Sequence, residues 1–276
     1  MSDYDQIILE HYQKVAQSAG SSPESTMMDS RTRELETKLL TNFFVKAIKN
    51  FEANGKGASS LVVADFGCGN GYTLDILSRI DSRPSFIGYE YSPDLRAIAK
   101  ERFNDGRVDI RPVDIRNPEM IGPELIDISI TQRVIINLLN EADQAIARNN
   151  LIQAASPDGM FMFIECFQSG LDNLNAARQE FDLEAIPPAH HNLYLTDDFF
   201  EHDGLIVSEE LMSESPQNFL STHYYVSRVL HQLVLGDKPF ARNSHFVNFM
   251  SQSLLQNVGN FSPIRANVFR KKKSRK

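Results

Sequence analysis

The sequence predicts an α/β protein built on a seven-stranded, mostly parallel, doubly wound sheet. From residue 61 onward, short apolar segments alternate with amphipathic helical patterns, which is typical of parallel strands joined by right-handed crossovers. The first apolar segment ends in an acid and a glycine-rich turn, Asp65 to Gly71, and the second ends in Glu90. A glycine-rich turn followed by an acidic strand end indicates a nucleotide-type site at the carboxyl edge of the sheet.

The composition is compatible with one large α/β domain and attached helices. The chain has 276 residues, of which 42% are hydrophobic. No apolar run approaches the roughly 20 residues of a membrane span, and no secretory leader is present, so we expect a cytoplasmic protein. Cys68 and Cys166 are expected to be free thiols.

The charge pattern disfavours nucleic acid as a partner. The net charge is −8, which is the wrong sign for a broad nucleic-acid surface. The basic run over residues 270–276 is the exception. We interpret it as a solvated tail, with contact to a phosphate or a membrane surface as the alternative.

The first 58 residues are expected to form an N-terminal helical lid. Apolar residues recur at helical spacing over 3–18, and a second helix is expected from Asp29 or Ser30 to about Phe51. The polar break over 25–31 could close over a bound cofactor. A sheet domain is expected over 59–270 and a basic tail over 271–276.

The glycine turn lies between an expected strand, 61–66, and an expected helix, 71–80. Glycine lets the backbone turn sharply and approach a ligand closely. The spacing is Asp-x-Gly-x-Gly-x-Gly, which departs from the G-x-G-x-x-G of dinucleotide-binding folds. Glu90, at the end of the strand expected over 84–90, is placed to accept hydrogen bonds from both ribose hydroxyls. It would repel a 2′-phosphate, which argues against NADP.

This unit resembles the first motif of class I S-adenosylmethionine (SAM) methyltransferases, in which the strand-end acid and the glycines hold the methionine part of the cofactor. The resemblance covers about residues 60–166 and the last strand, and it implies SAM as cofactor and S-adenosylhomocysteine (SAH) as product. It also implies an adenine contact at the end of the strand expected over 107–113, where a helix N-cap is the alternative. The implied cofactor-binding residues are Asp65, Gly67, Cys68, Gly69, Asn70, Glu90, Tyr91, Asp114, Ile115 and Gln132.

The segment after the fourth strand, Gln132–Leu138, resembles the part of small-molecule methyltransferases that lines both cofactor and substrate. The sequence has neither the Asn/Asp-Pro-Pro-Tyr motif of amide and base N-methylation nor the Pro-Cys nucleophile of pyrimidine methylation. Methylation of nucleic-acid bases is therefore disfavoured.

A stiff polar loop is expected over 182–200, on the substrate side of the sheet. It contains His190-His191-Asn192-Leu193-Tyr194, and a histidine can act as a general base near neutral pH. A structural hydrogen bond is the equally weighted alternative. For a hydroxyl acceptor we expect His191, paired with Asn192, to be the base, and Tyr194, Arg133 and Glu165 to orient the substrate. No metal is expected, because no His/Cys cluster has ligand spacing.

A helical insertion over 216–260 is expected between the sixth strand, 204–213, and the last strand, 264–270. It is too long for an ordinary loop, so we interpret it as a substrate cap, with the interface of a homodimer as the alternative. The remaining expected strands are 125–131 and 159–166, and the remaining expected helices are 93–103, 141–154, 171–181, 218–235 and 244–258.

The sequence thus predicts a SAM-dependent methyltransferase acting on a small molecule, at a hydroxyl of a sugar-like or natural-product substrate. The acceptor class comes from a looser resemblance to methyltransferases of bacterial polysaccharide and natural-product clusters. The segments that carry this resemblance are Thr26–Asp29, Arg33–Glu36, Gln132–Leu138 and His191–Tyr194. The alternatives are a protein or RNA methyltransferase, which only the basic tail supports, and a protein of this fold that binds without catalysis.

Overall fold

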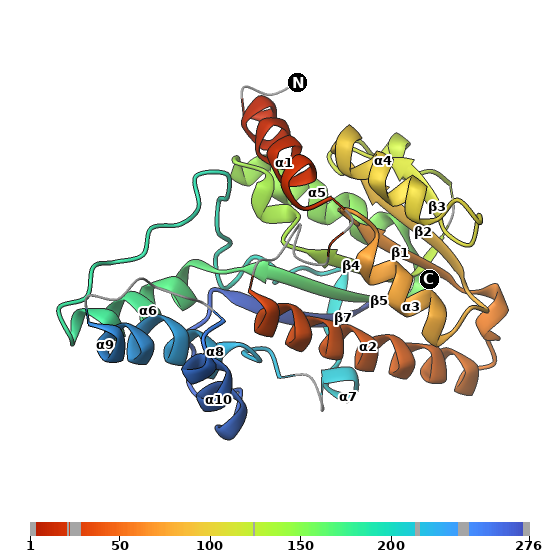
Figure 1. Ribbon diagram of the computed structural model, residues 1–276. Helices are drawn as coiled ribbons and strands as arrows, with labels where there is room; N and C mark the ends of the chain where they lie inside the picture. Colours follow the sequence, from red (N-terminus) through yellow and green to blue (C-terminus); the bar gives the residue numbers. More distant parts are fainter. Residues whose placement is uncertain are drawn as a thin grey trace.

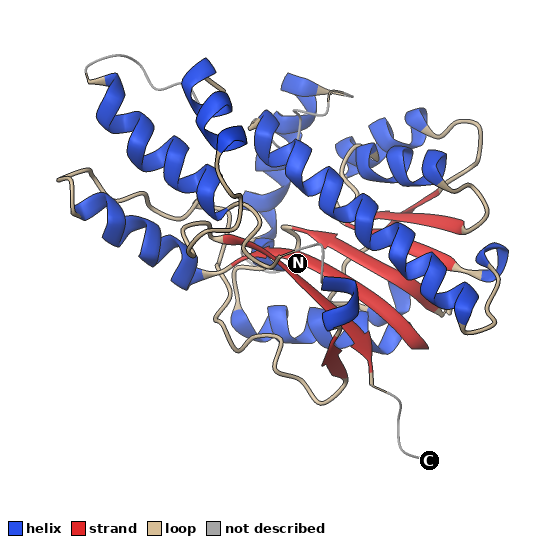
Figure 2. Ribbon diagram, turned by 90° about the horizontal axis from the view of Figure 1, so that it is seen from below, coloured by secondary structure: helices blue, strands red, loops and turns tan. Residues whose placement is uncertain are grey.

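A twisted seven-stranded sheet with helices on both faces organises the chain (Figures 1 and 2). The computed structural model describes residues 4–20, 22, 29–123, 125–212, 216–236 and 243–272. The strand order is β3-β2-β1-β4-β5-β7-β6, and β7 alone runs antiparallel to its neighbours. The strands are β1 (Val62–Phe66), β2 (Ser85–Glu90), β3 (Asp109–Pro112), β4 (Ile126–Gln132), β5 (Ala155–Cys166), β6 (Leu205–Val207) and β7 (Ile264–Lys271). The predicted mostly parallel, doubly wound sheet is confirmed.

Ten α-helices are present in the part of the chain that the structure describes. They are α1 (Asp5–Ala19), α2 (Ser30–Ala53), α3 (Tyr72–Ile80), α4 (Pro93–Arg102), α5 (Glu141–Ala154), α6 (Gln168–Gln179), α7 (Glu209–Met212), α8 (Ser221–Tyr225), α9 (His231–Leu235) and α10 (His245–Ser253). A π-helical segment, Val226–Leu230, joins α8 to α9. A 3₁₀ turn, η4 (Ile135–Asn137), follows β4. None of the described helices is both long enough and apolar enough to pass through a bilayer.

The two N-terminal helices have different positions. The apolar stripe of α2, with Phe43, Phe44 and Ala47 at 0% exposure, packs into the main core against the sheet. In contrast, α1 lies over the carboxyl end of the sheet and packs beside α4 (Figure 1). Only α1 is therefore placed as a lid, and α2 belongs to the core. The break expected to close over the cofactor lies largely outside the described residues, as do Thr26–Met28.

The sheet reverses direction between β1 and β4. From β1 the chain builds outward to β2 and β3, and from β4 it builds the other way to β5. In an open α/β sheet, such a switch point leaves a crevice at the carboxyl ends of the two central strands. The glycine turn lies there, between the end of β1 at Phe66 and the start of α3 at Tyr72.

Two predicted strands and one predicted helix differ from the structure. The helix expected over 244–258 ends at Ser253. The strand expected over 204–213 is only three residues long, because α7 begins at Glu209, where two acidic residues in its first turn favour a helix start. The strand expected from residue 159 begins earlier, at Ala155, and its pairing with β4 shifts register between Ile126 and Ile128. The loop expected over 182–200 contains no helix or strand, apart from one isolated bridge between Phe167 and Leu195.

Candidate active site

The glycine turn is held in a conformation that other residues adopt at a cost. Gly67, Gly69 and Gly71 have φ values of 72°, 57° and 79°. The amides of Gly67 and Cys68 both donate to the carbonyl of Tyr89, at 2.7 and 2.9 Å, which ties the end of β1 to β2. A Cβ atom on Gly67 would lie 2.4 Å from Cγ2 of Val134. The turn therefore requires glycine for its backbone angle and for the space beside it.

Glu90 connects the glycine turn to the end of β2. Its carboxylate accepts hydrogen bonds from the amides of Gly69 and Ser92, both at 2.7 Å. Burial raises the pKa of Glu90, and these amides oppose that shift. Each carboxylate oxygen has a second lone pair, so the group can hold the turn and still accept hydroxyl donors from a ligand.

Asp65 is a buried acid with unmet hydrogen-bonding capacity. Its side chain is 0% exposed, and neither carboxylate oxygen has a hydrogen-bond partner among the described residues. Burial, and then the nearby Glu90, raise the pKa of Asp65 to about 8. Two close carboxyl groups with one left unsatisfied form a site suited to a cation.

A cavity opens above the glycine turn and the end of β2. Nine of the ten expected cofactor residues line it, and Asp65 lies outside its lining. Helix α1, part of the expected N-terminal lid, forms one wall together with Arg33 of α2, but no residue of either helix was among the expected cofactor-binding residues. Among the lining residues are Tyr4, Asp5, Ile8, Tyr12, Arg33, Gly67, Cys68, Gly69, Asn70, Glu90, Tyr91, Asp114, Ile115, Arg116, Gln132, Arg133 and Asn137.

Salt bridges and amide contacts fasten α1 over this cavity. Arg116 pairs with Asp114 at 2.6 Å, with Asp5 of α1 at 3.0 Å and with Asp143 at 3.4 Å. Asp114, and then Asp5, raise the pKa of Arg116 against the opposing effect of burial. At the other end of α1, Nδ2 of Asn70 donates to the carbonyl of Gly20 at 3.1 Å. The guanidinium of Arg116 therefore joins α1 to Asp114, just after β3.

A second cavity lies on the other side of Arg133, and three side chains line both cavities. These shared residues are Tyr12, Arg133 and Asn137. Nδ2 of Asn137 donates to the Tyr12 hydroxyl at 2.8 Å, and burial raises the pKa of Tyr12 to about 12. A ligand in the first cavity and a ligand in the second would meet at this junction. We call the two spaces the cofactor cavity and the acceptor cavity.

Arg133 is anchored at the junction by Glu36 of α2. Glu36 is fully buried and accepts a hydrogen bond from Nη1 of Arg133, while Nη1 of Arg33 lies 4.0 Å from its other oxygen. Arg133 itself has a φ of 58°, a conformation that is uncommon outside glycine. The two arginines thus share one buried carboxylate, which sets where their guanidinium groups lie.

The deep wall of the acceptor cavity carries a second charged cluster. Asp29 caps α2 through the amide of Thr32, contacts Nε2 of the buried His223 at 2.9 Å and lies 3.5 Å from Arg228. Burial opposes its ionisation, but His223 and Arg228 outweigh burial and hold the pKa of Asp29 well below its usual range. Arg228 lies in the π-helical segment and stacks over Tyr224, 3.6 Å from the ring centre. The helical insertion therefore forms one wall of the acceptor cavity.

His191 and Tyr194 both line the acceptor cavity, as expected from the sequence. The ring of His191 stacks on His11 of α1, with centroids 3.7 Å apart. Its Nδ1 and Oδ1 of Asn192 each lack a hydrogen-bond partner within the described chain, so the expected His191–Asn192 pairing is not formed. Burial, together with His11 and His190, lowers the pKa of His191 to about 4, and the ring is neutral at pH 7.

Glu165 has an indirect place in the site. It is fully buried at the end of β5 and lines neither cavity. Its carboxylate accepts from Oγ1 of Thr131 at 2.7 Å and from the amides of Val134 and Ile135 at 3.1 and 3.3 Å. The expectation that Glu165 orients the substrate directly is corrected by this geometry. The carboxylate instead holds the turn that carries Arg133 and Asn137.

The known proteins that match this chain were found by comparing structures, and not by comparing sequences. No family model and no curated protein matches the sequence. The plantazolicin methyltransferase BamL, solved with a triazolic desmethylPZN analogue and SAH, aligns over 99% of this chain and 100% of its own, with 14% identity and a TM-score of 0.51. A putative methyltransferase in complex with the Haloferax volcanii Trm112 activator aligns over 78% of this chain and 83% of its own, with 13% identity and a TM-score of 0.51.

A third match is shorter. CalS10, an amino pentose methyltransferase from Micromonospora echinaspora solved with SAM, aligns over 47% of this chain and 52% of its own, with 19% identity and a TM-score of 0.39. The two longer matches extend over most of both chains. The chain therefore has the fold of the class I SAM-dependent methyltransferases.

Proposed function

We propose that this protein is a SAM-dependent methyltransferase whose acceptor is a small molecule, methylated at a hydroxyl of a sugar-like or natural-product substrate. The observation that carries the proposal is the junction of the two cavities at Tyr12, Arg133 and Asn137. A methyl donor above the glycine turn and an acceptor beyond Arg133 would face each other there.

The residues of the cofactor cavity fit SAM. The sulfonium and ammonium charges of SAM match the acidic end of the cavity at Glu90, next to which the buried Asp65 has two oxygens without a partner among the described residues. We assign Glu90 to the ribose hydroxyls and Arg33, which lines the same cavity, to the carboxylate of the methionine part. The adenine contact remains assigned to Asp114 and Ile115, with Arg116 holding Asp114 in place.

SAM supplies an electrophilic methyl group when bound, so the protein has to position the acceptor, exclude water and accept a proton. Positioning is assigned to Arg133 and Tyr194, which line the acceptor cavity. The proton is assigned to His191, which is neutral at pH 7 and has a free Nδ1 within the described structure. Helix α1 and the insertion over 216–260 are assigned as lid and cap, because each forms a wall.

The first test is calorimetry of the full chain with SAM, SAH and NAD. SAM and SAH should bind with one site per chain, and NAD should not bind. The second test offers methyl-labelled SAM with a panel of small hydroxylated compounds and looks for a labelled product. Absence of SAM and SAH binding would remove the proposal, whereas binding without any labelled product would favour a non-catalytic protein of this fold.

The protein or RNA alternative depends on the basic tail, of which residues 273–276 lie outside the described structure. Because β7 continues to Lys271 and Arg270 pairs with Glu210 at 3.0 Å, a truncation test should keep residue 271 and remove 272–276. Small-molecule methylation should survive this truncation. A homodimer through the helical insertion is also a proposal, supported by exposed apolar side chains on α10 and after it, such as Phe249 and Leu255, and sedimentation analysis would test it.

A further inference from the structure

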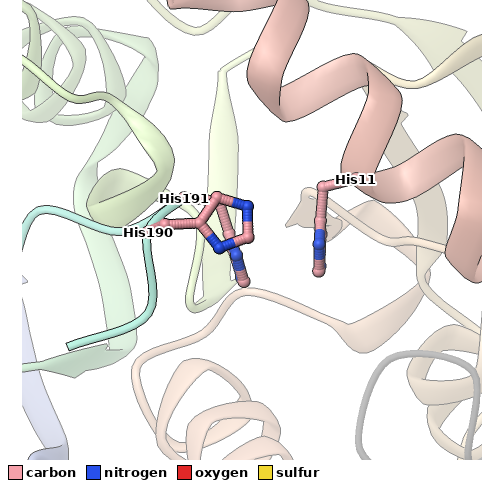
Figure 3. A group of neighbouring side chains, drawn as sticks. All are labelled: His11, His190 and His191. Atoms are coloured by element: carbon pink, nitrogen blue, oxygen red, sulfur yellow. The ribbon is translucent and has the colours of Figure 1, made fainter. Parts of the chain in front are cut away.

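Three histidines meet at the edge of the acceptor cavity (Figure 3). His11 comes from α1, whereas His190 and His191 come from the loop after α6. One ring nitrogen from each of the three lies within 4.8 Å of the others. The proposed methyl transfer uses His191 alone. It does not explain why all three histidines lie together.

The three rings lie close together, but a bound metal would require a different arrangement of the rings. The rings of His11 and His191 are stacked, with centroids 3.7 Å apart, and the ring of His190 stands edge-on to both (Figure 3). Zn–N bonds of about 2.0–2.1 Å in a tetrahedron place ligand nitrogens about 3.4 Å apart. Since a metal lies in the plane of each imidazole that binds it, the stacked pair has to open by side-chain rotation, with little movement of the backbone.

The ring nitrogens are available to bind a metal. Nδ1 of His191 is buried and has no hydrogen-bond partner among the described residues. His190 is exposed, which leaves the site open to ions from solution. The positive charge of Lys14 lies close enough to His11 to repel a cation, and it therefore opposes metal binding.

We propose that His11, His190 and His191 bind one divalent transition-metal ion, with zinc as the natural choice for three imidazoles. Three protein ligands leave a fourth position of a tetrahedral ion open, and His11 and His191 line the acceptor cavity. The ion fastens α1 to the loop after α6, and so closes the lid against the acceptor side. The site shares His191 with the proposed methyl transfer, but metal binding can be tested without any methyl acceptor.

The test uses the full chain without a histidine tag, stripped with a chelator and titrated with Co²⁺ and then with Zn²⁺. We expect one equivalent of Co²⁺ to give the visible absorption of a tetrahedral site, and Zn²⁺ to displace it. The variants His11→Gln and His191→Gln should each weaken binding by at least about 100-fold, because loss of a ligand costs more than loss of its outer partner. His245→Gln alters an exposed histidine on α10 and should bind as the unmodified protein does.

A second readout detects the link between α1 and the loop. Zn²⁺ should raise the melting temperature of the unmodified protein and of His245→Gln, since a ligand that binds the folded state alone stabilises it. It should leave His11→Gln unchanged, while the metal-free melting temperatures of the three proteins stay close. Equal Co²⁺ affinity in the unmodified protein and His11→Gln would overturn the proposal, and so would an octahedral spectrum that all variants share.

Discussion

The cofactor cavity and the acceptor cavity are built from different parts of the chain. The floor of the cofactor cavity is backbone: a glycine turn after β1 whose amides bond to Tyr89 and Glu90 at the end of the adjacent strand, β2. The acceptor cavity is formed by side chains from α1, the loop after α6 and the helical insertion. A site made of backbone tolerates few changes, whereas a site made of side chains can change its ligand without altering the sheet. Substitutions should therefore separate cofactor affinity from turnover.

The largest effect is expected in the acceptor cavity, from His191→Ala. If His191 accepts the proton of the acceptor hydroxyl, turnover should fall by about 10²–10⁴-fold, the usual contribution of a general base. SAM affinity should stay the same, because His191 does not line the cofactor cavity. Labelled-methyl transfer and calorimetry on one preparation measure both quantities.

The variant His11→Gln tests whether His191 acts as a base or as a metal ligand. In the presence of a chelator, a base role for His191 predicts near-normal turnover for His11→Gln and low turnover for His191→Ala. Equal losses in both variants would show that the stacked pair acts as a unit, and full activity of His191→Ala would remove it as the base.

In the cofactor cavity, Glu90→Ala should weaken SAM binding by about 3 kcal/mol, or roughly 100-fold, because charged hydrogen bonds are lost and the amides of Gly69 and Ser92 lose their acceptor. Asp127→Asn is the matched control. Asp127 is also a buried acid, bonded to Lys56 at 2.5 Å, but it lies near the start of β4, at the opposite edge of the sheet. It should lower stability and leave SAM affinity unchanged. Calorimetry that gives equal affinities for both variants would contradict the ribose assignment.

A smaller effect, on the free energy of unfolding, should distinguish the glycine turn at Gly67 from the ordinary turn at Gly106. Gly67→Ala and Gly106→Ala both place a side chain on a backbone with positive φ, at 72° and 77°. That strain costs about 1–2 kcal/mol. Only Gly67→Ala adds an overlap with Val134, worth about 1–3 kcal/mol more, since nothing lies within 4 Å of a Cβ on Gly106. Urea unfolding of the two variants should show this difference, and equal losses would mean that the turn can relax.

The contrast between the cavities also explains what could be predicted from the sequence. Gly67, Gly69 and Glu90 are separated by one strand–helix–strand unit, whose geometry is nearly constant, so their spacing predicts that they meet. The same regularity places Tyr91, Asp114 and other strand-end residues around the cofactor cavity.

The residues that were missed depend on contacts between distant segments. Tyr12 and Arg33 lie on the N-terminal helices, and their positions depend on how α1 and α2 pack against the sheet, for which the sequence has no local signal. His11 meets His191 for the same reason, so no metal-ligand spacing is visible in the chain. Glu165 was assigned to the acceptor because it ends a strand, but a strand-end side chain can also point beneath the edge and bond to a turn, as its contacts with Thr131 and Val134 show.

The smallest expected effect concerns proton binding by Asp65, the acid beneath the cofactor cavity. Because its pKa is raised to about 8, Asp65 is mostly protonated at pH 7, whereas a bound cation favours the carboxylate. SAM binding should therefore release a proton. Affinity should rise by up to about tenfold between pH 6.5 and pH 7.5, where the ammonium of SAM remains charged.

Stability of the free protein should respond to pH in the opposite direction. The folded state keeps a proton on Asp65 that the unfolded state releases near pH 4, so the stabilising contribution is complete below that pH and is lost as the pH rises towards about 8. Asp65→Asn keeps the shape and removes the titration. It should flatten both pH profiles, weaken SAM binding at pH 7.5 and make the free protein more stable there. Unchanged profiles in Asp65→Asn would mean that another group carries the proton and that the cation of SAM lies elsewhere in the cavity.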